Sequence, residues 1–458
     1  MKKIIVTILT VVMLITVSCS SDFTDLTSEN ALNTDNFYKT KDDFNAGVLA
    51  IYAKLQVQVN IYFELVEYRS DNLDILAPTS GTVDRYDICK FKETSSNALI
   101  QNAWTNFYNG IFRANVIIDR INNANFDAKL KKQYEGEARF IRALTYFNIV
   151  RFWGDAPLVL KEITVSESLV TGRTAASKVY ESIEEDLKFA AANLPVSYPS
   201  SDFGRVTSGA AKALLGKVYL TEKKYLETAT ILNEIVGKYS LQSDISNVFN
   251  TSNKANSEIV FSIRYNKELS SEGHGLWFGI SDVSTSSFTT KLVTNYKVND
   301  TRKSLIDYKK IGNEYVPGKF YDTQSTSTKN YGNDYILLRY ADVLLMLAEA
   351  LNEQNYQVTG QALDNLNAVR VRATLPKLTA IDVPNQASFR KAVLNERFLE
   401  FPLEGQRWFD LVRTNTAQQE INSAIGITIQ SYQLLYPVPQ TEIEKINNKS
   451  IFDQNDGY

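Results

Sequence analysis

The feature that most constrains the fold is an apolar seam in the C-terminal third of the chain. Over residues 336–353 the seam consists of Ile336, Tyr340, Val343, Leu344, Leu347 and Leu351. Their i, i+3, i+4, i+7 spacing places side chains on one face of an α-helix. The sequence therefore predicts a helix over 336–353 that packs along one side against a neighbour.

A charged stretch follows at residues 395–413. Its charged residues recur every three or four positions and are Glu396, Arg397, Glu400, Glu404, Arg407, Asp410 and Arg413. This spacing allows ion pairs and hydrogen bonds that brace neighbouring helices. A simply solvated face is the alternative, but Trp408 and Phe409 within the stretch favour partial burial.

Helical periodicity extends over much of the rest of the chain. The further predicted helices cover residues 42–58, 104–122, 131–152, 175–193, 208–221 and 225–238. The third of these ends at Gly154-Asp155-Ala156-Pro157, because Gly and Pro terminate helices. These elements predict a mainly α-helical fold.

Two helix pairs resemble tetratricopeptide units. Leu215, Gly216, Tyr219, Tyr225 and Ala229 approximate the spacing in which small residues let paired helices approach and aromatic rings fill the gap. A second pair is predicted at Leu347, Ala348, Leu351, Ala362, Leu363 and Leu366. Because Leu215 and Leu347 are 132 positions apart, the pairs do not form an uninterrupted solenoid.

Two irregular regions interrupt the helices, at about residues 68–96 and 265–333. A short strand, EIVFSIR at 258–264, precedes the second region. Long irregular segments in a compact protein tend to be functional or disordered, and the aromatic content here argues against disorder. We therefore expect these insertions to carry a binding face.

The N-terminus predicts export. Lys2 and Lys3 precede an apolar run over 4–17, which is too short for a permanent membrane span and reads as a signal peptide over 1–18. Cys19, followed by polar residues, resembles the acylated cysteine of a bacterial lipoprotein, although Thr16 stands where such sites usually carry Leu. Acyl chains would anchor the protein at about 0.8 kcal/mol per buried methylene. Secretion with cleavage elsewhere is the alternative.

The remainder, 19–458, is expected to be a single domain without an intrachain disulfide, because Cys89 is the only other cysteine. We expect Cys89 to be a small buried apolar side chain. The net charge of −3 argues against a nucleic-acid partner, since phosphate binding needs clustered Lys and Arg.

The inventory of reactive residues offers little for catalysis. His274 is the single histidine, which excludes a metal site built from several histidines. No G-x-S-x-G element, phosphate-cradling loop or dinucleotide fingerprint is present, so we expect no cofactor and no metal. A glycosidase needs only two carboxylates, and the sequence leaves that possibility open.

The irregular regions are better suited to binding. Flat aromatic rings cover the apolar faces of sugars, while Asp, Asn and Arg bond the hydroxyl groups. The candidate ligand-binding residues are Asp71, Asn72, Arg85, Tyr86, Tyr265, His274, Trp277 and Phe278. Trp277 is the leading candidate because Gly275 and Gly279 leave room beside its ring. For each aromatic residue, core packing is the alternative.

Motifs spread over almost the whole mature chain resemble the SusD/RagB family of outer-membrane lipoproteins. They include Trp104-x2-Phe107-Tyr108-x-Gly110-Ile111, Glu137-Ala138-Arg139-Phe140-x-Arg142-Ala143, Phe152-x-Gly154-Asp155-x-Pro157, Gly204-Arg205-Val206-Thr207, Leu338-Arg339-Tyr340-Ala341-Asp342, Asn367-x2-Arg370-x-Arg372-Ala373, Asn395-Glu396-Arg397, Arg407-Trp408-x-Asp410-Leu411-x-Arg413, Pro437-x-Pro439-Gln440 and Gln454-Asn455-x-Gly457-Tyr458.

The resemblance implies a helical body with tetratricopeptide-like pairs, long insertions carrying short strands, and no enzymatic activity. It also implies an outer-membrane location facing the cell exterior, a carbohydrate ligand and a partner, a SusC-like TonB-dependent transporter that imports the captured oligomers. Because ligand residues vary within the family, none is carried over by motif. Binding of peptides or protein fragments on the same fold remains the alternative, and a surface hydrolase is a remote one.

Overall fold

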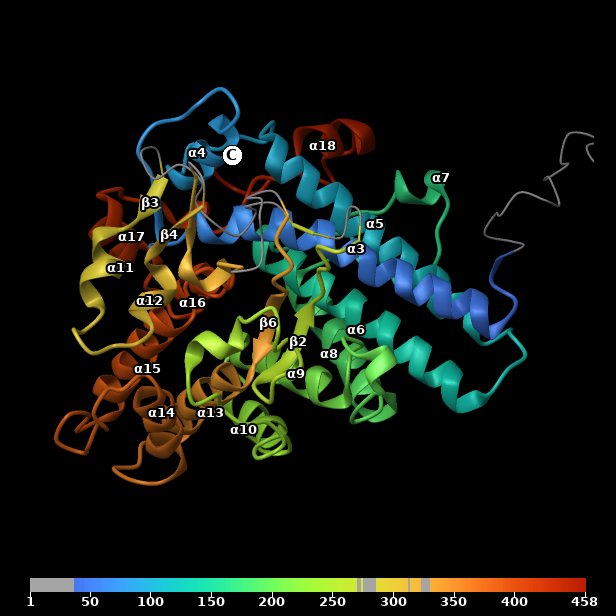
Figure 1. Ribbon diagram of the computed structural model, residues 1–458. Helices are drawn as coiled ribbons and strands as arrows, with labels where there is room; N and C mark the ends of the chain where they lie inside the picture. The colour runs from blue at the N-terminus through green and yellow to red at the C-terminus, as the bar shows by residue number, and fades with distance from the viewer. Residues whose placement is uncertain (1–36, 270–272, 275–285, 312–313, 323–329) are drawn as a thin grey trace, which may run out of the picture.

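The computed structural model describes residues 37–269, 273–274, 286–311, 314–322 and 330–458 (Figure 1). It is mainly α-helical, as the sequence predicts. The N-terminal layer comprises α3 (Lys41–Glu67), α5 (Ala98–Ile121), α6 (Ala128–Trp153) and α8 (Ala176–Asn193). These helices pack in succession, and α3 begins with a capping box between Thr40 and Asp43.

Helix α3 is longer than the sequence predicts. Its apolar positions beyond residue 58 are buried on several sides and include Val59, Tyr62, Phe63, Leu65 and Val66. All-round burial removes the amphipathic alternation that marks a helix in sequence. The helix therefore continues into the segment immediately before the first irregular region.

The two predicted tetratricopeptide-like pairs are confirmed. They are α9 (Ser208–Thr221) with α10 (Tyr225–Asn233), and α13 (Tyr340–Gln354) with α14 (Gln361–Arg372). Helix α10 packs on both α9 and α13, so pairs distant in sequence are stacked in space. Helix α10 stops at Asn233 rather than at residue 238, because 234–238 form turns that lead to Gly237 at φ 76°.

The prediction of one helix over 336–353 is wrong at its start. Residues Tyr335–Arg339 form strand β6, which pairs antiparallel with β2 (Ile259–Ile263) and so confirms the strand predicted there. Ile336 is opposite Ser262, and Leu338 is opposite Phe261. A partner strand remote in sequence satisfies the backbone donors and acceptors of this segment, which outweighs a local helical spacing.

The charged stretch at 395–413 also divides into two helices. Helix α15 (Gln386–Glu400) ends before Pro402, and α16 (Arg407–Arg413) begins after Gly405. Leu403 and Gly405 both have φ of 66°, a left-handed backbone that no helix contains. The chain continues through α17 (Ala417–Ile425) and α18 (Gln440–Ile446).

The insertions contain most of the short elements. The strands there are β1 (Leu73–Ile75), β3 (Ser286–Phe288), β4 (Tyr308–Ile311) and β5 (Glu314–Pro317). The short helices there are α4 (Val83–Cys89), α11 (Thr290–Asn295), α12 (Lys303–Ile306) and the 3-10 helix η4 (Gly318–Phe320). Outside the insertions lie α7 (Val165–Ser168) and the 3-10 helices η2 (Ser200–Asp202), η3 (Ile245–Val248) and η5 (Ser431–Leu434).

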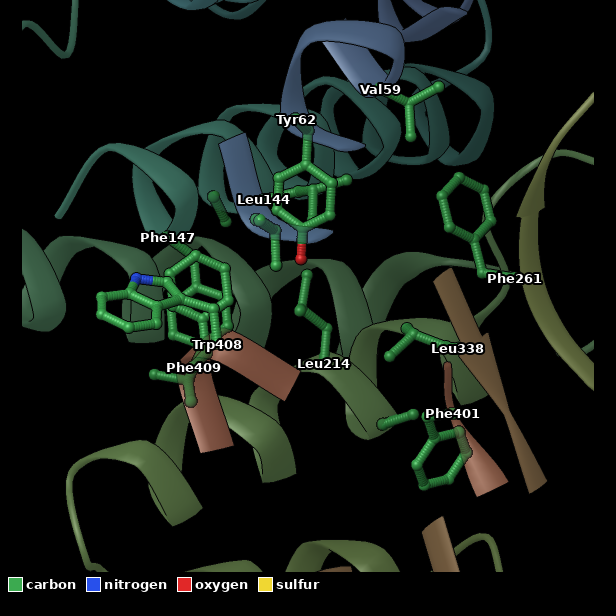
Figure 2. Packing of buried hydrophobic residues seen from close by; sticks show 14 of the residues in the cluster. Val59, Tyr62, Leu144, Phe147, Leu214, Phe261, Leu338, Phe401, Trp408 and Phe409 are labelled. Atoms are coloured by element: carbon green, nitrogen blue, oxygen red, sulfur yellow. The ribbon is translucent and has the colours of Figure 1, made fainter. Parts of the chain in front are cut away.

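The hydrophobic core joins the N-terminal and C-terminal halves. Figure 2 shows Tyr62 of α3 above Leu144 and Leu214 of α6 and α9, with Phe409 of α16 close by. Cys89 of α4 is fully buried in the same core, as predicted, and burial raises the pKa of its thiol to about 12. Helices from distant parts of the chain thus share one apolar interior.

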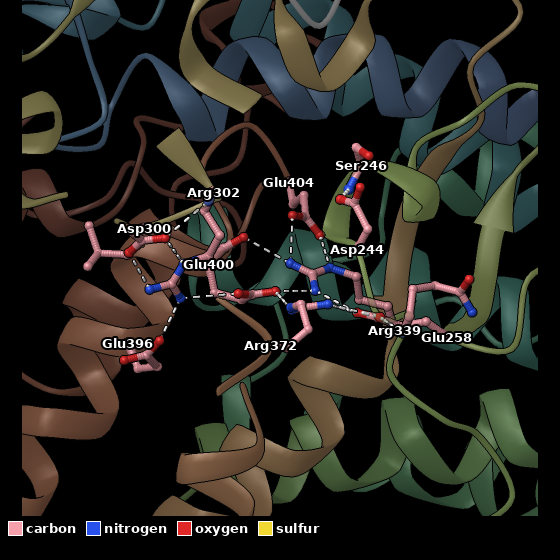
Figure 3. A network of polar contacts seen from close by, with 12 residues as sticks. Asp244, Ser246, Glu258, Asp300, Arg302, Arg339, Arg372, Glu396, Glu400 and Glu404 are labelled. Carbon is pink, nitrogen blue, oxygen red and sulfur yellow. Dashed lines mark hydrogen bonds and ion pairs between the residues drawn. The ribbon is translucent and has the colours of Figure 1, made fainter. Parts of the chain in front are cut away.

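A buried ion network lies beside this core (Figure 3). Among the described residues it contains five cations and five carboxylates: Arg302, Lys319, Arg339, Arg370 and Arg372, with Glu258, Asp300, Glu396, Glu400 and Glu404. Burial alone would raise the pKa of Glu400, but Arg372, Arg339 and Arg302 lower that pKa to about 2. This confirms that the charged stretch braces the helices rather than facing solvent.

Candidate ligand-binding face

The two irregular regions meet in space. Strand β1 of the first region pairs antiparallel with β3 of the second, with Leu73 opposite Phe288 and Ile75 opposite Ser286. The backbone of Thr289 then donates to the carbonyl of Asn72 at 2.9 Å. In Figure 1, α4, β3 and β4 lie together at the C-terminal end of α3. The insertions therefore form one surface, which we call the binding face.

Helix α4 presents two of the sequence-predicted residues at this face. Tyr86 is half-buried, and the Nζ atoms of Lys90 and Lys92 both lie 5.9 Å from its ring centroid. Arg85 forms a bidentate ion pair with Glu64 of α3, and its guanidinium lies 5.0 Å from the ring centroid of Tyr68. The ion pair and the ring hold α4 against α3 and leave part of Tyr86 accessible.

Tyr265 and His274 form a separate pair farther along α3. Their ring centroids are 5.1 Å apart, and both side chains are buried. The hydroxyl of Tyr265 donates to the carbonyl of Gln56 at 3.0 Å, and it lies 3.2 Å from Oδ1 of Asn60. The backbone of His274 exchanges hydrogen bonds with that of Tyr331. Tyr265 is therefore packed against α3, with His274 beside it.

One stripe of α3 connects the two pairs. Gln56 and Asn60 contact Tyr265, and Glu64 contacts Arg85. Positions four and eight apart lie on the same side of a helix, and eight residues span roughly 12 Å. The binding face therefore follows one side of α3, with Tyr86 at one end and Tyr265 at the other.

Asp71 and Asn72, two of the sequence-predicted ligand residues, are held by protein partners. Both are fully buried: Asp71 accepts from Arg407 at 2.7 Å and from Lys291 at 2.7 Å, and Asn72 donates to Glu67 at 2.8 Å. Burial would raise the pKa of Asp71, but Arg407 and Lys291 lower it, so the carboxylate stays ionised. The partners of Asp71 come from α11 and α16, and the partner of Asn72 comes from α3.

Trp277 and Phe278 lie outside the described residues, as does Cys19. The described part of the face offers aromatic residues that the sequence reasoning did not select. The ring of Tyr308 lies 5.5 Å from that of Phe288 and 6.5 Å from that of Tyr315. The dipeptide Gly312-Asn313 between β4 and β5 is a hairpin-turn signal that would have predicted this pair of strands.

No group of three or more potential metal ligands occurs among the described residues. In that same part of the chain, none of the helices combines the length and the apolar character needed to cross a bilayer.

Comparison with known proteins assigns the fold to a family. A model of the SusD family matches residues 249–458, and a model described as starch-binding associating with outer membrane matches residues 22–220. The chain belongs to the SusD/RagB family. Members of this family are outer-membrane-associated carbohydrate-binding proteins without catalytic activity, and the chain is accordingly a binding protein and not an enzyme. The two-carboxylate hydrolase that the sequence left open is thereby set aside.

Individual SusD-like proteins align over nearly their whole length. SusD-like protein P25 of Formosa agariphila is 26% identical over 90% of this chain and 91% of its own length. A SusD superfamily structure from Bacteroides vulgatus has a TM-score of 0.79 at 22% identity, covering 92% of this chain and 100% of that one.

A structure of surface glycan-binding protein A from Bacteroides thetaiotaomicron, in complex with laminarihexaose, has a TM-score of 0.75 at 20% identity. It covers 90% of this chain and 99% of that one. At these identities the solved structures establish the SusD fold of this chain.

Proposed function

We propose that this protein is a cell-surface, lipid-anchored glycan-binding protein that captures an oligosaccharide or polysaccharide and delivers it to a SusC-like TonB-dependent outer-membrane transporter. The observation that carries the proposal is the β1–β3 pairing, in which Leu73 is opposite Phe288, 215 positions farther along the chain. This pairing joins the two insertions into one face outside the helical scaffold. A scaffold that needed only to pack its helices would not require this joined surface.

The chemistry of the face suits a sugar. Tyr86, Tyr308 and Tyr315 are partly exposed aromatic residues, and rings of this kind cover the apolar face of a pyranose. The loop before α4 adds exposed Thr79 and Ser80 for hydroxyl contacts. A relative of the same fold is described with laminarihexaose bound, which supports a glycan in preference to a peptide.

The proposed ligand contacts are Tyr86, Trp277 and Phe278, with Arg85 at the edge. Tyr265 and His274 are proposed to shape the other end of the face from beneath. Asp71 and Asn72 are assigned to the scaffold because they are fully buried with protein partners.

The lipid anchor and the transporter partner are supported by observations other than the binding face. The signal-peptide pattern that ends at Cys19 supports diacylation of that cysteine and places the mature body at residues 19–458. Membership of the SusD/RagB family is the support for the outward-facing position and for the transporter partner in this proposal.

The glycan assignment is tested with a chain of residues 20–458 and a broad oligosaccharide panel that includes laminarihexaose, measured by isothermal calorimetry. We expect saturable, metal-independent binding to at least one glycan, and loss of that binding in Trp277→Ala. Tyr225→Ala, in the half-buried start of α10, is the control and should bind normally.

A folded chain that binds no glycan would remove the carbohydrate assignment. Saturable binding of peptide mixtures alone would favour the peptide alternative.

A further inference from the structure

Residues 157–173 form a loop, here called the aliphatic loop, that exposes an unusual amount of apolar surface. Val165 is 79% exposed and Val170 is 72% exposed, and Leu160 and Leu169 are also exposed. Helix α7 within the loop has no buried residue. Aliphatic side chains gathered in one exposed segment indicate a surface that something else covers.

The aliphatic loop is held in a defined shape. Its two ends are joined by a bridge between Ala156 and Thr174, with backbone hydrogen bonds of 3.0 and 2.9 Å. The hydroxyl of Tyr146 donates to the carbonyl of Val159 at 2.9 Å, and Arg142 donates to the carbonyl of Leu160 at 2.8 Å. A capping box between Thr164 and Glu167 fixes α7. A preformed apolar surface loses little conformational entropy when a partner binds.

Helix α5 extends the same surface. Tyr108, Asn115 and Asp119 contact the loop at Pro157, Val159 and Glu162, and their spacing places them on one side of the helix. Phe112 is on that side between Tyr108 and Asn115, and it is 41% exposed. Its ring therefore lies beside the loop and adds an aromatic member to the apolar surface.

The aliphatic loop lies near the point where the chain enters the folded body. Tyr38 and Arg120 line one surface cleft, and Arg120 forms an ion pair with Glu162 of the loop at 2.9 Å. Figure 1 shows α7 standing clear of the helical body toward the end at which α3 begins. Residues 20–36 separate Cys19 from this point, and 17 residues reach at most roughly 60 Å when extended. An anchor at Cys19 thus keeps this end of the molecule within about 60 Å of the membrane.

The charges of the loop favour a protein over a lipid surface as its occupant. Membrane-binding segments carry Lys and Arg beside their apolar residues, to pair with anionic headgroups. Here the residues beside the aliphatic side chains include Glu162 and Glu167, with Lys161 as the one Lys or Arg between Leu160 and Val170. An apolar patch with carboxylates at its rim matches a protein interface.

We propose that the aliphatic loop and Phe112 dock on an apolar surface of an integral outer-membrane protein, namely the transporter of the proposed function, on which this inference rests. The docked edge is the one tethered through Cys19. The binding face, at the other end of α3, is then free to contact glycan.

The test uses full-length lipoprotein co-expressed with a SusC-like TonB-dependent transporter of the same organism. The complex is recovered from detergent through a tag on the transporter. Val165→Asp/Val170→Asp should lower the co-purified amount at least tenfold. Ile381→Asp is the matched control, since Ile381 is 89% exposed between α14 and α15, and it should co-purify like the wild type. Glycan binding by the 20–458 form should be unchanged in both variants.

The possible outcomes distinguish failure of the docking inference from failure of the proposed function. Normal co-purification of the double variant overturns the docking inference and leaves the proposed function intact. Failure of the wild type to co-purify removes the partner of the proposed function and the inference with it. Sedimentation of the 20–458 form with phosphatidylethanolamine–phosphatidylglycerol vesicles, abolished by the double variant, would replace the protein partner with the lipid surface and overturn the proposal.

Discussion

Two regions of the molecule contain arginines, carboxylates and aromatic rings: the buried ion network and the binding face. They differ in whether the charged side chains are buried or exposed. In the network, Arg339 is 1% exposed and contacts Glu258, Glu400 and Glu404. On the face, Arg85 has one carboxylate partner, Glu64, and its side chain is 31% exposed. Burial makes the network a determinant of folding, whereas exposure leaves the face available for a ligand.

This difference explains why the family motifs and the ligand contacts fall in different places. Arg339, Arg372, Glu396, Arg407 and Asp410 belong to the motifs that identify the family, and all are buried with protein partners. A buried charge requires its particular partner, since loss of that partner leaves an uncompensated ion. A half-exposed ring on the face carries no such requirement, so it can change with the ligand.

Glu67 lies where the two regions join. At the end of α3 it accepts from Asn72 of the first insertion at 2.8 Å and from the backbone of Gly405 at 2.7 Å. Burial raises its pKa to about 7, although hydrogen bonds from Asn72 and Gly405 oppose the rise. The junction of scaffold and face is therefore sensitive to proton uptake near neutral pH.

The largest expected effect is a loss of folding stability when the ion network is broken. Arg339→Leu leaves Glu258, Glu400 and Glu404 short of one cation, and breaking a buried pair from one side costs about 3–5 kcal/mol. Urea unfolding of the 20–458 form, followed by circular dichroism, measures the loss. Lys310→Ala on the exposed strand β4 is the control and should change stability by less than about 0.5 kcal/mol. A loss below about 1 kcal/mol for Arg339→Leu would show that the network contributes little to folding.

The next largest effect is on the pH dependence of stability, through Glu67 at the junction of scaffold and face. Because the pKa of Glu67 is raised on folding from an unfolded value of 4.5 to about 7, the folded state binds more protons between these values. The contribution of Glu67 is fully favourable below pH 4.5 and is lost as the pH rises through about 7, by roughly 3 kcal/mol in total. Glu67→Gln removes this dependence.

The readout for Glu67 is the difference in unfolding free energy between wild type and Glu67→Gln, measured from pH 4 to pH 8. That difference should shift in favour of the variant as the pH rises. Asp410→Asn is a control whose difference from wild type should stay nearly flat over this range. Arg397 and Arg413 overcome the effect of burial and lower the Asp410 pKa to about 2 from 3.8, so this carboxylate is ionised in both the folded and the unfolded state above about pH 4. If the difference in unfolding free energy between wild type and Glu67→Gln does not change with pH, the raised pKa of Glu67 is contradicted.

The smallest expected effect is on the face. Tyr86→Ala removes a partly exposed ring without breaking a buried charge pair, so glycan affinity should fall about tenfold, which corresponds to about 1.4 kcal/mol. Calorimetry with the glycan that binds wild type measures the change. Tyr225→Ala is the matched control for the loss of a half-buried tyrosine, and it should keep wild-type affinity. Equal losses in both variants would mean that Tyr86 acts only through folding.

Sequence patterns predicted the fold more completely than the face. The helix over 208–221 and the two helix pairs follow from periodicity and small-residue spacing, and the structure has them at those places. At Gly216 the reason is direct: an added Cβ would lie 2.4 Å from Cδ2 of Leu232, so glycine lets α9 and α10 approach without displacing that leucine. Periodicity failed at Tyr335–Arg339, where the segment pairs with a strand far away in sequence.

Sequence composition did not reveal which of the candidate ligand residues are buried. Asp71 and Asn72 belong to the same polar segment as Arg85, yet only Arg85 remains partly exposed. Tyr308 and Tyr315 are brought to the face by the pairing of β4 with β5, and the sequence between these strands is the turn signal Gly312-Asn313. Exposure depends on which distant helix covers a segment, and no local pattern carries that information.

By itself, the sequence determined the helical class of this protein, its stacked helix pairs and its membership of the SusD/RagB family, because these follow from local spacing and ordered motifs. Only the tertiary structure decided that β6 is a strand, that α15 and α16 are separate, and that the two insertions share one face. Each of these outcomes depends on hydrogen bonds or ion pairs between residues far apart in the chain, whose partners are chosen only when the core has formed.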